Sequence, residues 1–238
     1  MSLYRDRGVV LRTHKLGEAD RIITFVTEGH GKVRAVAKGV RRTKSKFGSR
    51  LEPFSHVDLQ LYTGRNLDIV NQAEMIDHLP ALRADLDRLA RGASMLEVVD
   101  QLAQEGEVNP QLYRMLVGAL RTLAASESPL VAPAFFWKVL ALEGYRPVLD
   151  RCAACGEAAD LVAFDLTEGG TLCRSCQRGT RITPEAVALL RRILGGALTG
   201  ALAEPLTPAT WEIEHLATRA LEHHLERRLR SPRLLEHG

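Results

Sequence analysis

The hydrophobic period of the chain changes once, near residue 79, and this change constrains the fold more than any other feature of the sequence. Before it, short segments alternate apolar and polar residues, as strands with one buried face do. After it, apolar residues recur every three or four positions, as they do on amphipathic helices. The sequence therefore predicts an α+β protein with a β-rich domain over residues 1–78 and a mostly helical domain over residues 79–238.

Five short strands separated by turns are predicted in the first domain. The clearest alternation places Val57, Leu59 and Leu61 on one face and the polar residues between them on the other. Five strands in so short a segment indicate a small antiparallel barrel, and a basic loop between the third and fourth strands fits an OB-fold, a fold whose strand faces and loops hold single-stranded nucleic acid. The predicted strands span residues 4–15, 20–27, 32–38, 57–61 and 67–73.

Proline and glycine residues delimit the helices predicted in the second domain. A helix or helix pair is expected from Leu79, with an interruption near Gly92 and an end at Gly106. Polar residues that precede proline are typical helix starts, and aromatic residues on the third helix are expected to pack in the core or between domains. Such starts occur at Asn109-Pro110, Ser128-Pro129, Thr183-Pro184 and Thr207-Pro208.

The last predicted helix runs through Leu229 and carries a basic outer face. This face is either a second phosphate contact or a solvated helix end whose cations complement the helix dipole. Its basic residues are Arg219, His223, His224, Arg227, Arg228 and Arg230.

The segment from Lys32 to Arg50 contains eight basic residues and no acidic residue. It begins as a strand and continues as a loop rich in Gly, Ser and Thr. Several cations on one loop release counterions together when they meet a polyanion, so the segment indicates nucleic-acid binding, with a solvated surface loop as the alternative. The candidate nucleic-acid-binding residues are Lys32, Arg34, Lys38, Arg41, Arg42, Lys44, Lys46, Arg50 and, on a later turn, Arg65.

The positive charge of the chain is concentrated at its N-terminal end. Residues 1–80 contain 14 Lys/Arg and nine Asp/Glu, whereas the remaining residues contain 18 Lys/Arg and 20 Asp/Glu. This asymmetry suggests that the first domain meets the polyanion and that the second has another role.

The four cysteines form two CxxC pairs with the spacing C-x2-C-x17-C-x2-C. This spacing is typical of a four-thiolate zinc site, and four protein ligands leave no open position for water, so one structural zinc ion per chain is predicted. The segment between the pairs resembles a short hairpin with Gly169-Gly170 at its tip, inside a zinc-ribbon-like module over residues 150–180. Free structural cysteines and redox chemistry are the less favoured alternatives. The predicted ligands are Cys152, Cys155, Cys173 and Cys176.

Several classes of function lack their sequence signatures. No stretch of about 18 apolar residues predicts a membrane span, and the N-terminus lacks the apolar core of a signal peptide, so a cytoplasmic protein is expected. There is no P-loop and no GxGxxG motif, and the histidines and carboxylates form no convergent set. The sequence therefore predicts a binding protein with no enzymatic activity, no small-molecule substrate and no membrane partner.

Two segments and the CxxC pairs together resemble the RecO family of bacterial recombination mediators. The segments are GVVLRTHKLGEADRIITFVTEGHGK (8–32) and AVAKGVRRTKSKFGSRLEPFSHVDLQLYTGR (35–65). The resemblance implies an N-terminal OB-fold, binding of single- and double-stranded DNA, and annealing of complementary strands. It also implies a partnership with RecR, and the pair helps RecA load onto strands coated by single-strand-binding protein. A nucleoid-associated location follows from this role.

The resemblance bears unequally on the two candidate sites. The basic run from Lys38 to Arg50 resembles the DNA-binding stretch of the family. The cysteines are not kept by every member, so the zinc prediction depends on this sequence alone. In some members the helical domain docks the acidic, apolar tail of single-strand-binding protein, but the sequence does not place that groove here.

Two other functions compete with a DNA-annealing mediator. In a zinc-containing protein-interaction adaptor, the barrel and helices bind proteins and the basic loop is incidental. A metal-dependent nuclease is the least favoured, because no convergent set of carboxylates is visible.

Overall fold

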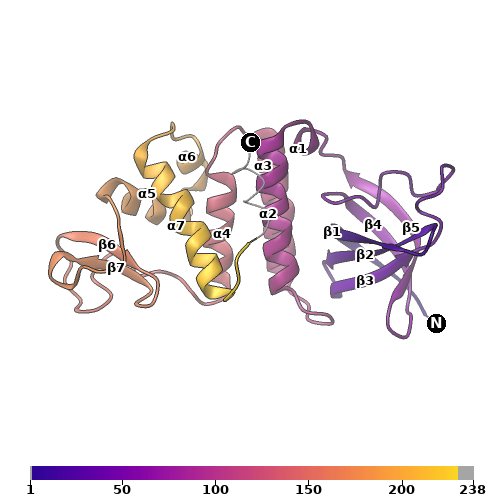
Figure 1. Cartoon of the computed structure of the whole chain (residues 1–238), viewed down its shortest axis with the longest axis horizontal. Coiled ribbons are helices and arrows are strands. Elements are labelled where there is room, and N and C mark those ends of the chain that lie inside the picture. Colours follow the sequence, from indigo (N-terminus) through magenta and orange to yellow (C-terminus); the bar gives the residue numbers. More distant parts are fainter. Residues whose placement is uncertain (1, 230–238) are drawn as a thin grey trace. The chain divides into compact units, whose positions relative to one another are not determined.

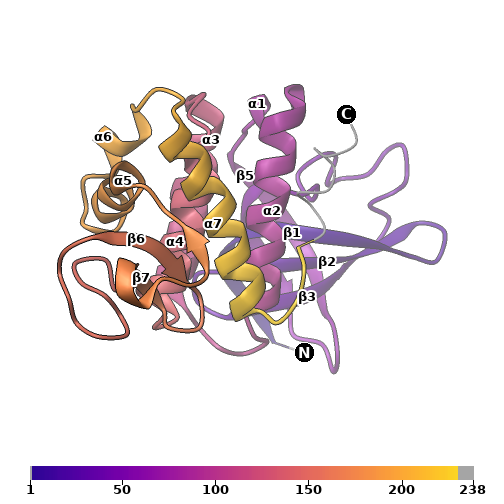
Figure 2. The ribbon, with the colours of Figure 1, turned by 60° about the vertical axis from the view of Figure 1, so that its left-hand side comes forward.

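The computed structural model describes residues 2–229, which form two compact units, residues 2–125 and Ser126–Leu229. The first unit holds a β-barrel and the helices α1–α3, and the second holds a small sheet and the helices α4–α7 (Figures 1 and 2). The boundary predicted from the change of hydrophobic period, between residues 78 and 79, lies inside the first unit. The helices that directly follow the barrel thus belong to the same compact unit as the barrel.

Five strands close the barrel in the order β1-β2-β3-β5-β4, with β1 and β4 pairing to complete it. Every neighbouring pair is antiparallel except β3 and β5, which pair in parallel. The predicted α+β class with an OB-like five-stranded barrel is confirmed. The strands are β1 (Leu3–Leu16), β2 (Asp20–Thr27), β3 (Gly31–Ala37), β4 (His56–Tyr62) and β5 (Asp68–Asp77).

Alternation along the strands fills the interior of the barrel. On β3, Val33, Ala35 and Ala37 are buried, while Lys32 and Arg34 point outward. A residue period of two sends alternate side chains to opposite faces, so the same strand supplies both core and basic surface. The core also takes residues from all the other strands, Ile23, Phe25, Val57, Leu59, Leu61 and Val70 among them.

Three helices follow the barrel in the first unit: α1 (Ala81–Ala84), α2 (Leu86–Leu102) and α3 (Pro110–Ala125). The predicted pair of helices is present, but the break falls at Asp85 and α2 continues through Gly92. Asp85 is extended and its carboxylate accepts the backbone N–H of Arg88, which makes it a regular N-cap. A capping carboxylate at this position explains the break better than the lower helix propensity of glycine.

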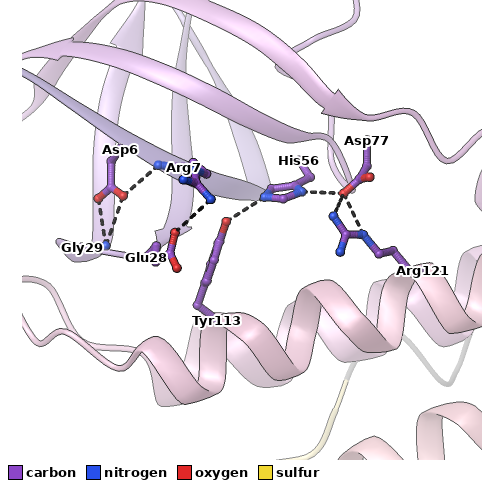
Figure 3. A network of polar contacts seen from close by, with 8 residues as sticks. All are labelled: Asp6, Arg7, Glu28, Gly29, His56, Asp77, Tyr113 and Arg121. Carbon is purple, nitrogen blue, oxygen red and sulfur yellow. Dashed lines mark hydrogen bonds and ion pairs between the residues drawn. The ribbon is translucent and has the colours of Figure 1, made fainter.

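A polar network joins the barrel to α3 (Figure 3). The buried His56 lies at the start of β4, with Nδ1 2.6 Å from Asp77 Oδ2 and Nε2 2.7 Å from the Tyr113 hydroxyl. Arg121 donates to the same Asp77 oxygen from Nε at 3.0 Å and from Nη2 at 2.7 Å. Burial by itself raises the pKa of Asp77, but the hydrogen bonds from Arg121 and His56 outweigh it and hold that pKa below its usual value.

In the second unit, α4 is the most apolar helix, and it packs against α5 and α7. Phe135, Phe136 and Trp137 are buried, as expected for core aromatics. A three-stranded sheet in the order β7-β6-β8 completes the unit. Its elements are α4 (Val131–Leu142), β6 (Leu161–Asp165), β7 (Gly170–Cys173), the 3-10 turn η1 (Arg174–Cys176), β8 (Thr180–Arg181), α5 (Pro184–Leu194), α6 (Leu198–Leu202) and α7 (Pro208–His224).

The ends of these helices test the predicted starts and stops. Thr183 and Thr207 cap α5 and α7 through their hydroxyl oxygens, as predicted. The last helix is shorter than predicted, because it ends at His224 and Glu226 has a left-handed φ of 50°. Of the predicted basic face, Arg227 and Arg228 therefore lie beyond the helix, and Arg230 lies outside the described residues.

Among the described residues, no helix combines the length and the apolar character that crossing a bilayer requires.

Candidate nucleic-acid interface and cysteine cluster

The basic loop, residues 38–55 between β3 and β4, is anchored in the barrel by two apolar side chains. Phe47 is 2% exposed and Leu51 is 1% exposed, and both belong to the barrel core. Val40 packs partly against the same core. Because these anchors point inward, the polar residues between them are held at the surface.

Six cations of the basic loop lie on this surface. None of them has a carboxylate partner among the described residues, and three donate only to backbone carbonyl groups: Arg41 to Gly17, Lys46 to Asn71 and Arg50 to Lys46. A carbonyl group carries no net charge, so these hydrogen bonds position the cations without neutralising them. The six exposed residues are Lys38, Arg41, Arg42, Lys44, Lys46 and Arg50.

The two cations of β3 have a different environment. The Lys32 ammonium lies 2.9 Å from Asp100 Oδ1 and also donates to the Asp100 carbonyl on α2, with only 15% of its side chain exposed. The Arg34 guanidinium lies 3.6 Å from a Glu105 carboxylate oxygen. Both side chains are therefore paired with carboxylates from α2 and the segment after it, and Asp100 is shared with Arg12, whose Nε lies 2.6 Å from Oδ2.

Arg65 lies apart from the basic loop, on the turn between β4 and β5. It lines a pocket of about 270 Å³ together with Arg34, Tyr4 and His30. None of the six loop cations lines this pocket. The structure thus places the nine predicted residues in two groups: the six exposed cations of the basic loop, and Lys32, Arg34 and Arg65, which all line this pocket.

The four cysteine sulfurs converge in the second unit. Their Sγ atoms all lie within 4.8 Å of one another, and Cys155 and Cys173 are 3.7 Å apart. A tetrahedral zinc ion with bonds of about 2.3 Å separates its sulfur ligands by about 3.8 Å, so the spacing fits such an ion. No disulfide links them. The predicted grouping of the two CxxC pairs is confirmed, and the cluster is close enough to hold a metal ion.

The closeness of these thiols also favours a cation in the cluster. Backbone hydrogen bonds, the strongest from Cys173, lower the pKa of Cys152 to about 6. Hydrogen bonds from the neighbouring Cys155 and Cys173 sulfurs raise the pKa of Cys176 to about 12. Four thiolates this close repel one another, so only a positive ion between them allows all four to ionise.

The predicted hairpin presents the second pair of cysteines. Strands β6 and β7 pair antiparallel from Leu161 opposite Cys173 to Asp165 opposite Gly170. Phe164 on β6 packs edge-to-face on Trp137 of α4, with ring centroids 5.8 Å apart. The apolar cluster around the cysteines is small and contains only Ala163 and Leu172 besides two of the cysteines as buried members. The module therefore has little core of its own.

Comparison with known proteins identifies the family. The model for the N-terminal domain of recombination protein O matches residues 1–79, and the model for its C-terminal domain matches residues 83–233. This chain belongs to the RecO family. The chain is 47% identical to the DNA repair protein RecO of Streptomyces avermitilis, in an alignment that covers 99% of this chain and 100% of that protein. Neither the family descriptions nor the name of this relative denotes an enzymatic activity.

Sequence reasoning missed the residues that hold the basic loop in place. Phe47 and Leu51 stand four residues apart in an otherwise polar stretch, a signal of anchoring that the sequence does display. Arg21 on β2 forms a 2.6 Å ion pair with Glu52, and no pattern in the sequence connects these two residues. The segment is thus an anchored surface loop rather than a free one.

Proposed function

We propose that this protein is a DNA-binding recombination mediator that anneals complementary single strands during DNA repair. In this proposal the basic loop contacts single- and double-stranded DNA. With RecR, the protein helps RecA load onto strands coated by single-strand-binding protein, at the nucleoid in the cytoplasm. Membership of the RecO family supports the repair role.

The observation that carries the proposal is the uncompensated charge of the basic loop. Six cations stand on an anchored segment, and no carboxylate pairs with them among residues 2–229. Cations that are not already paired are the ones that release counterions from a nucleic-acid backbone. The paired residues Lys32 and Arg34 contribute less, because the attraction of Asp100 and Glu105 must first be overcome.

Annealing by such a surface needs no covalent step. Two complementary strands repel each other through their phosphates, and a cationic surface lowers this repulsion. Contacts to phosphate and sugar leave the base edges free to pair and do not depend on sequence. Sequence-independent contact suits a protein that acts wherever DNA is broken.

We further propose that the cysteine cluster holds one structural zinc ion. Cys152, Cys155, Cys173 and Cys176 would supply all four ligands, so the ion would stabilise the module without taking part in chemistry.

Neutralising the loop tests the DNA contact. Changing Arg41, Arg42, Lys44 and Lys46 together to glutamine should weaken binding to every DNA sequence. On single strands it should also flatten the dependence of log affinity on log salt, by about 0.7 for each phosphate that the variant no longer neutralises. The measurement is fluorescence anisotropy with a labelled oligonucleotide at several salt concentrations. Unchanged affinity at moderate salt would show that the loop does not bind DNA.

A matched control removes the same charge elsewhere. It neutralises four exposed arginines whose side chains form no ion pair among the described residues. If the loss of binding depends on location, this variant should keep more affinity than the loop variant. The control arginines are Arg114, Arg151, Arg174 and Arg181.

Two further measurements separate the proposal from its alternatives. A protein-interaction adaptor would not retain labelled single-stranded DNA on a filter, whereas a mediator would. Annealing of strands coated by single-strand-binding protein, with and without RecR, tests the mediator role itself. A protein that binds bare DNA but does not accelerate annealing in either condition would remain a DNA-binding protein without this role.

A further inference from the structure

The first turn of the basic loop is tied to the neighbouring turn between β1 and β2. Gly39 has a left-handed φ of 67°, and its backbone N–H donates to Asp20 Oδ1 at 2.7 Å. The backbone N–H of Arg41 donates to the Ala19 carbonyl at 3.0 Å, and its guanidinium donates to the Gly17 carbonyl at 3.1 Å. These contacts join residues 17–20 to residues 39–41 at the point where β3 ends and the basic residues begin.

Asp20 is the only side-chain acceptor among these three contacts. Its carboxylate is partly buried, and its hydrogen bond goes to a backbone amide rather than to any of the cations of the loop. The Gly39 carbonyl in turn accepts the backbone N–H of Arg42 at 3.1 Å, which closes a tight turn. Holding Gly39 therefore sets the starting direction of the segment that bears Arg41 and Arg42.

Judged by its charge alone, Asp20 should weaken DNA binding. A carboxylate beside a cationic surface lowers the positive potential that a polyanion meets, so its removal should strengthen DNA binding. Ordering a mobile loop on binding costs free energy, however, and a loop already held in place avoids that cost. The two effects have opposite signs, so one substitution distinguishes them.

We infer that Asp20 is a positioning residue for DNA binding: it holds the first turn of the basic loop through Gly39, and this outweighs its unfavourable charge. Because the loop is the proposed DNA contact, this role rests on the proposed function. The ligand is the sugar-phosphate backbone of DNA, and Asp20 does not touch it.

The experiment compares Asp20→Ala with Glu18→Ala in the full chain. Glu18 lies two residues away on the same turn, is exposed, and forms no hydrogen bond or ion pair among the described residues. Both changes remove one negative charge, but only the first removes the acceptor for Gly39. Asp20→Ala should bind single-stranded DNA about threefold to tenfold more weakly than wild type, as expected for the loss of one hydrogen bond. Glu18→Ala should bind as tightly as wild type or more tightly.

The salt dependence separates positioning from direct contact. Asp20→Ala keeps every cation, so its plot of log affinity against log salt should shift downward without a change of slope. Arg42→Gln removes a cation and should flatten the slope. A flattened slope for Asp20→Ala, or an affinity equal to that of Glu18→Ala, would overturn the inference.

Limited trypsin digestion tests the loop without DNA. Trypsin cleaves after the exposed lysines and arginines, and cleavage of a folded protein follows the population of locally open states. Cleavage at Arg41 and Arg42, identified by fragment mass, should be about threefold to tenfold faster in Asp20→Ala and unchanged in Glu18→Ala. Equal rates in all three proteins would overturn the inference even if DNA binding changes.

The conservative variant Asp20→Asn separates the acceptor from the charge. An amide oxygen can still accept the Gly39 N–H, so this variant should restore most of the affinity and most of the resistance to trypsin. If it is as weak as Asp20→Ala in both measurements although its thermal unfolding matches wild type, the role of Asp20 is not that of a hydrogen-bond acceptor. Failure of the proposed function can be told apart from failure of this inference. If the proposed function is wrong, wild type does not bind DNA, while the trypsin result for Asp20→Ala still stands.

Discussion

The basic loop and the cysteine module are both irregular segments held in a defined shape, but they are held by different means. The basic loop inserts Phe47 and Leu51 into a barrel core supplied by five strands. The cysteine module has only a small apolar cluster and gathers four sulfurs within 4.8 Å instead. An irregular segment beside a large core can be held by apolar anchors, whereas one with little core needs a cross-link or a metal ion.

The difference also separates the roles of the two regions. Apolar anchors leave the outer surface of the basic loop available for cations. A metal ligand set directs its side chains inward, toward the ion. We therefore expect damage to the module to affect stability first and damage to the basic loop to affect DNA binding first.

The largest expected effect comes from breaking the metal site. Cys152→Ala should abolish zinc binding and unfold the module, because the binding free energy of a structural zinc ion, about 10 kcal/mol or more, contributes directly to folding. Elemental analysis should give one zinc per chain for wild type and none for the variant. Ser175→Ala, between two ligands and exposed, is the control and should keep the ion. Zinc-free wild-type protein, prepared with zinc present, would refute the site.

Removing an apolar anchor should have the next largest effect. Phe47→Ala removes a fully buried ring from the barrel core and should destabilise the first unit by about 3 to 5 kcal/mol. Urea unfolding monitored by circular dichroism measures the change. Phe47→Leu keeps most of the buried surface and should cost much less. A loss below about 1 kcal/mol for the alanine variant would mean that the ring does not anchor the loop.

Gly92 on α2 tests how closely the end of the basic loop packs on that helix, and Gly118 on α3 serves as its control. Phe54 has a left-handed φ of 72° and packs so closely on α2 that a Cβ at Gly92 would lie 2.8 Å from its ring. Gly92→Ala should therefore destabilise the unit by about 1 to 3 kcal/mol, despite the better helix propensity of alanine. A Cβ at Gly118 on α3 meets no atom within 4 Å, so Gly118→Ala should stabilise the same unit by up to about 1 kcal/mol. Thermal unfolding of both variants should show opposite shifts, and equal shifts would contradict the close packing.

The smallest expected effect concerns the network where the basic loop enters β4 at His56. Because hydrogen bonds lower the pKa of Asp77 in the folded state, its carboxylate contributes stability above its ordinary pKa of 3.8 and loses that contribution as the pH falls through the lower folded value. Asp77→Asn should thus be less stable than wild type at pH 7, by at most about 1 kcal/mol, and the difference should shrink near pH 3. Urea midpoints at the two pH values test this, and a difference that grows in acid would have the wrong sign.

Prediction from sequence succeeded where the signal was local. The alternation of Val57, Leu59 and Leu61 predicted β4, and the threonines before Pro184 and Pro208 predicted two helix starts. It gave no information on contacts with distant residues. Lys32 and Arg34 were grouped with the loop cations, and the structure pairs them with Asp100 and Glu105; their contact with DNA stays a prediction. One local signal was also misread, because the break in the first helix pair was expected at Gly92, whereas the N-cap residue Asp85 decides it.

The sequence by itself determined the α+β class, the β-barrel, the grouping of the cysteines and the sign of charge on the basic loop. Each of these follows from residue period, spacing or composition within one segment, so each is visible without coordinates. Only the tertiary structure decided which cations remain uncompensated and what holds the basic loop in place. Ion pairs such as Lys32–Asp100 and hydrogen bonds such as Gly39–Asp20 depend on where the folded backbone brings distant residues together, and the residue pattern of a single segment does not contain that information.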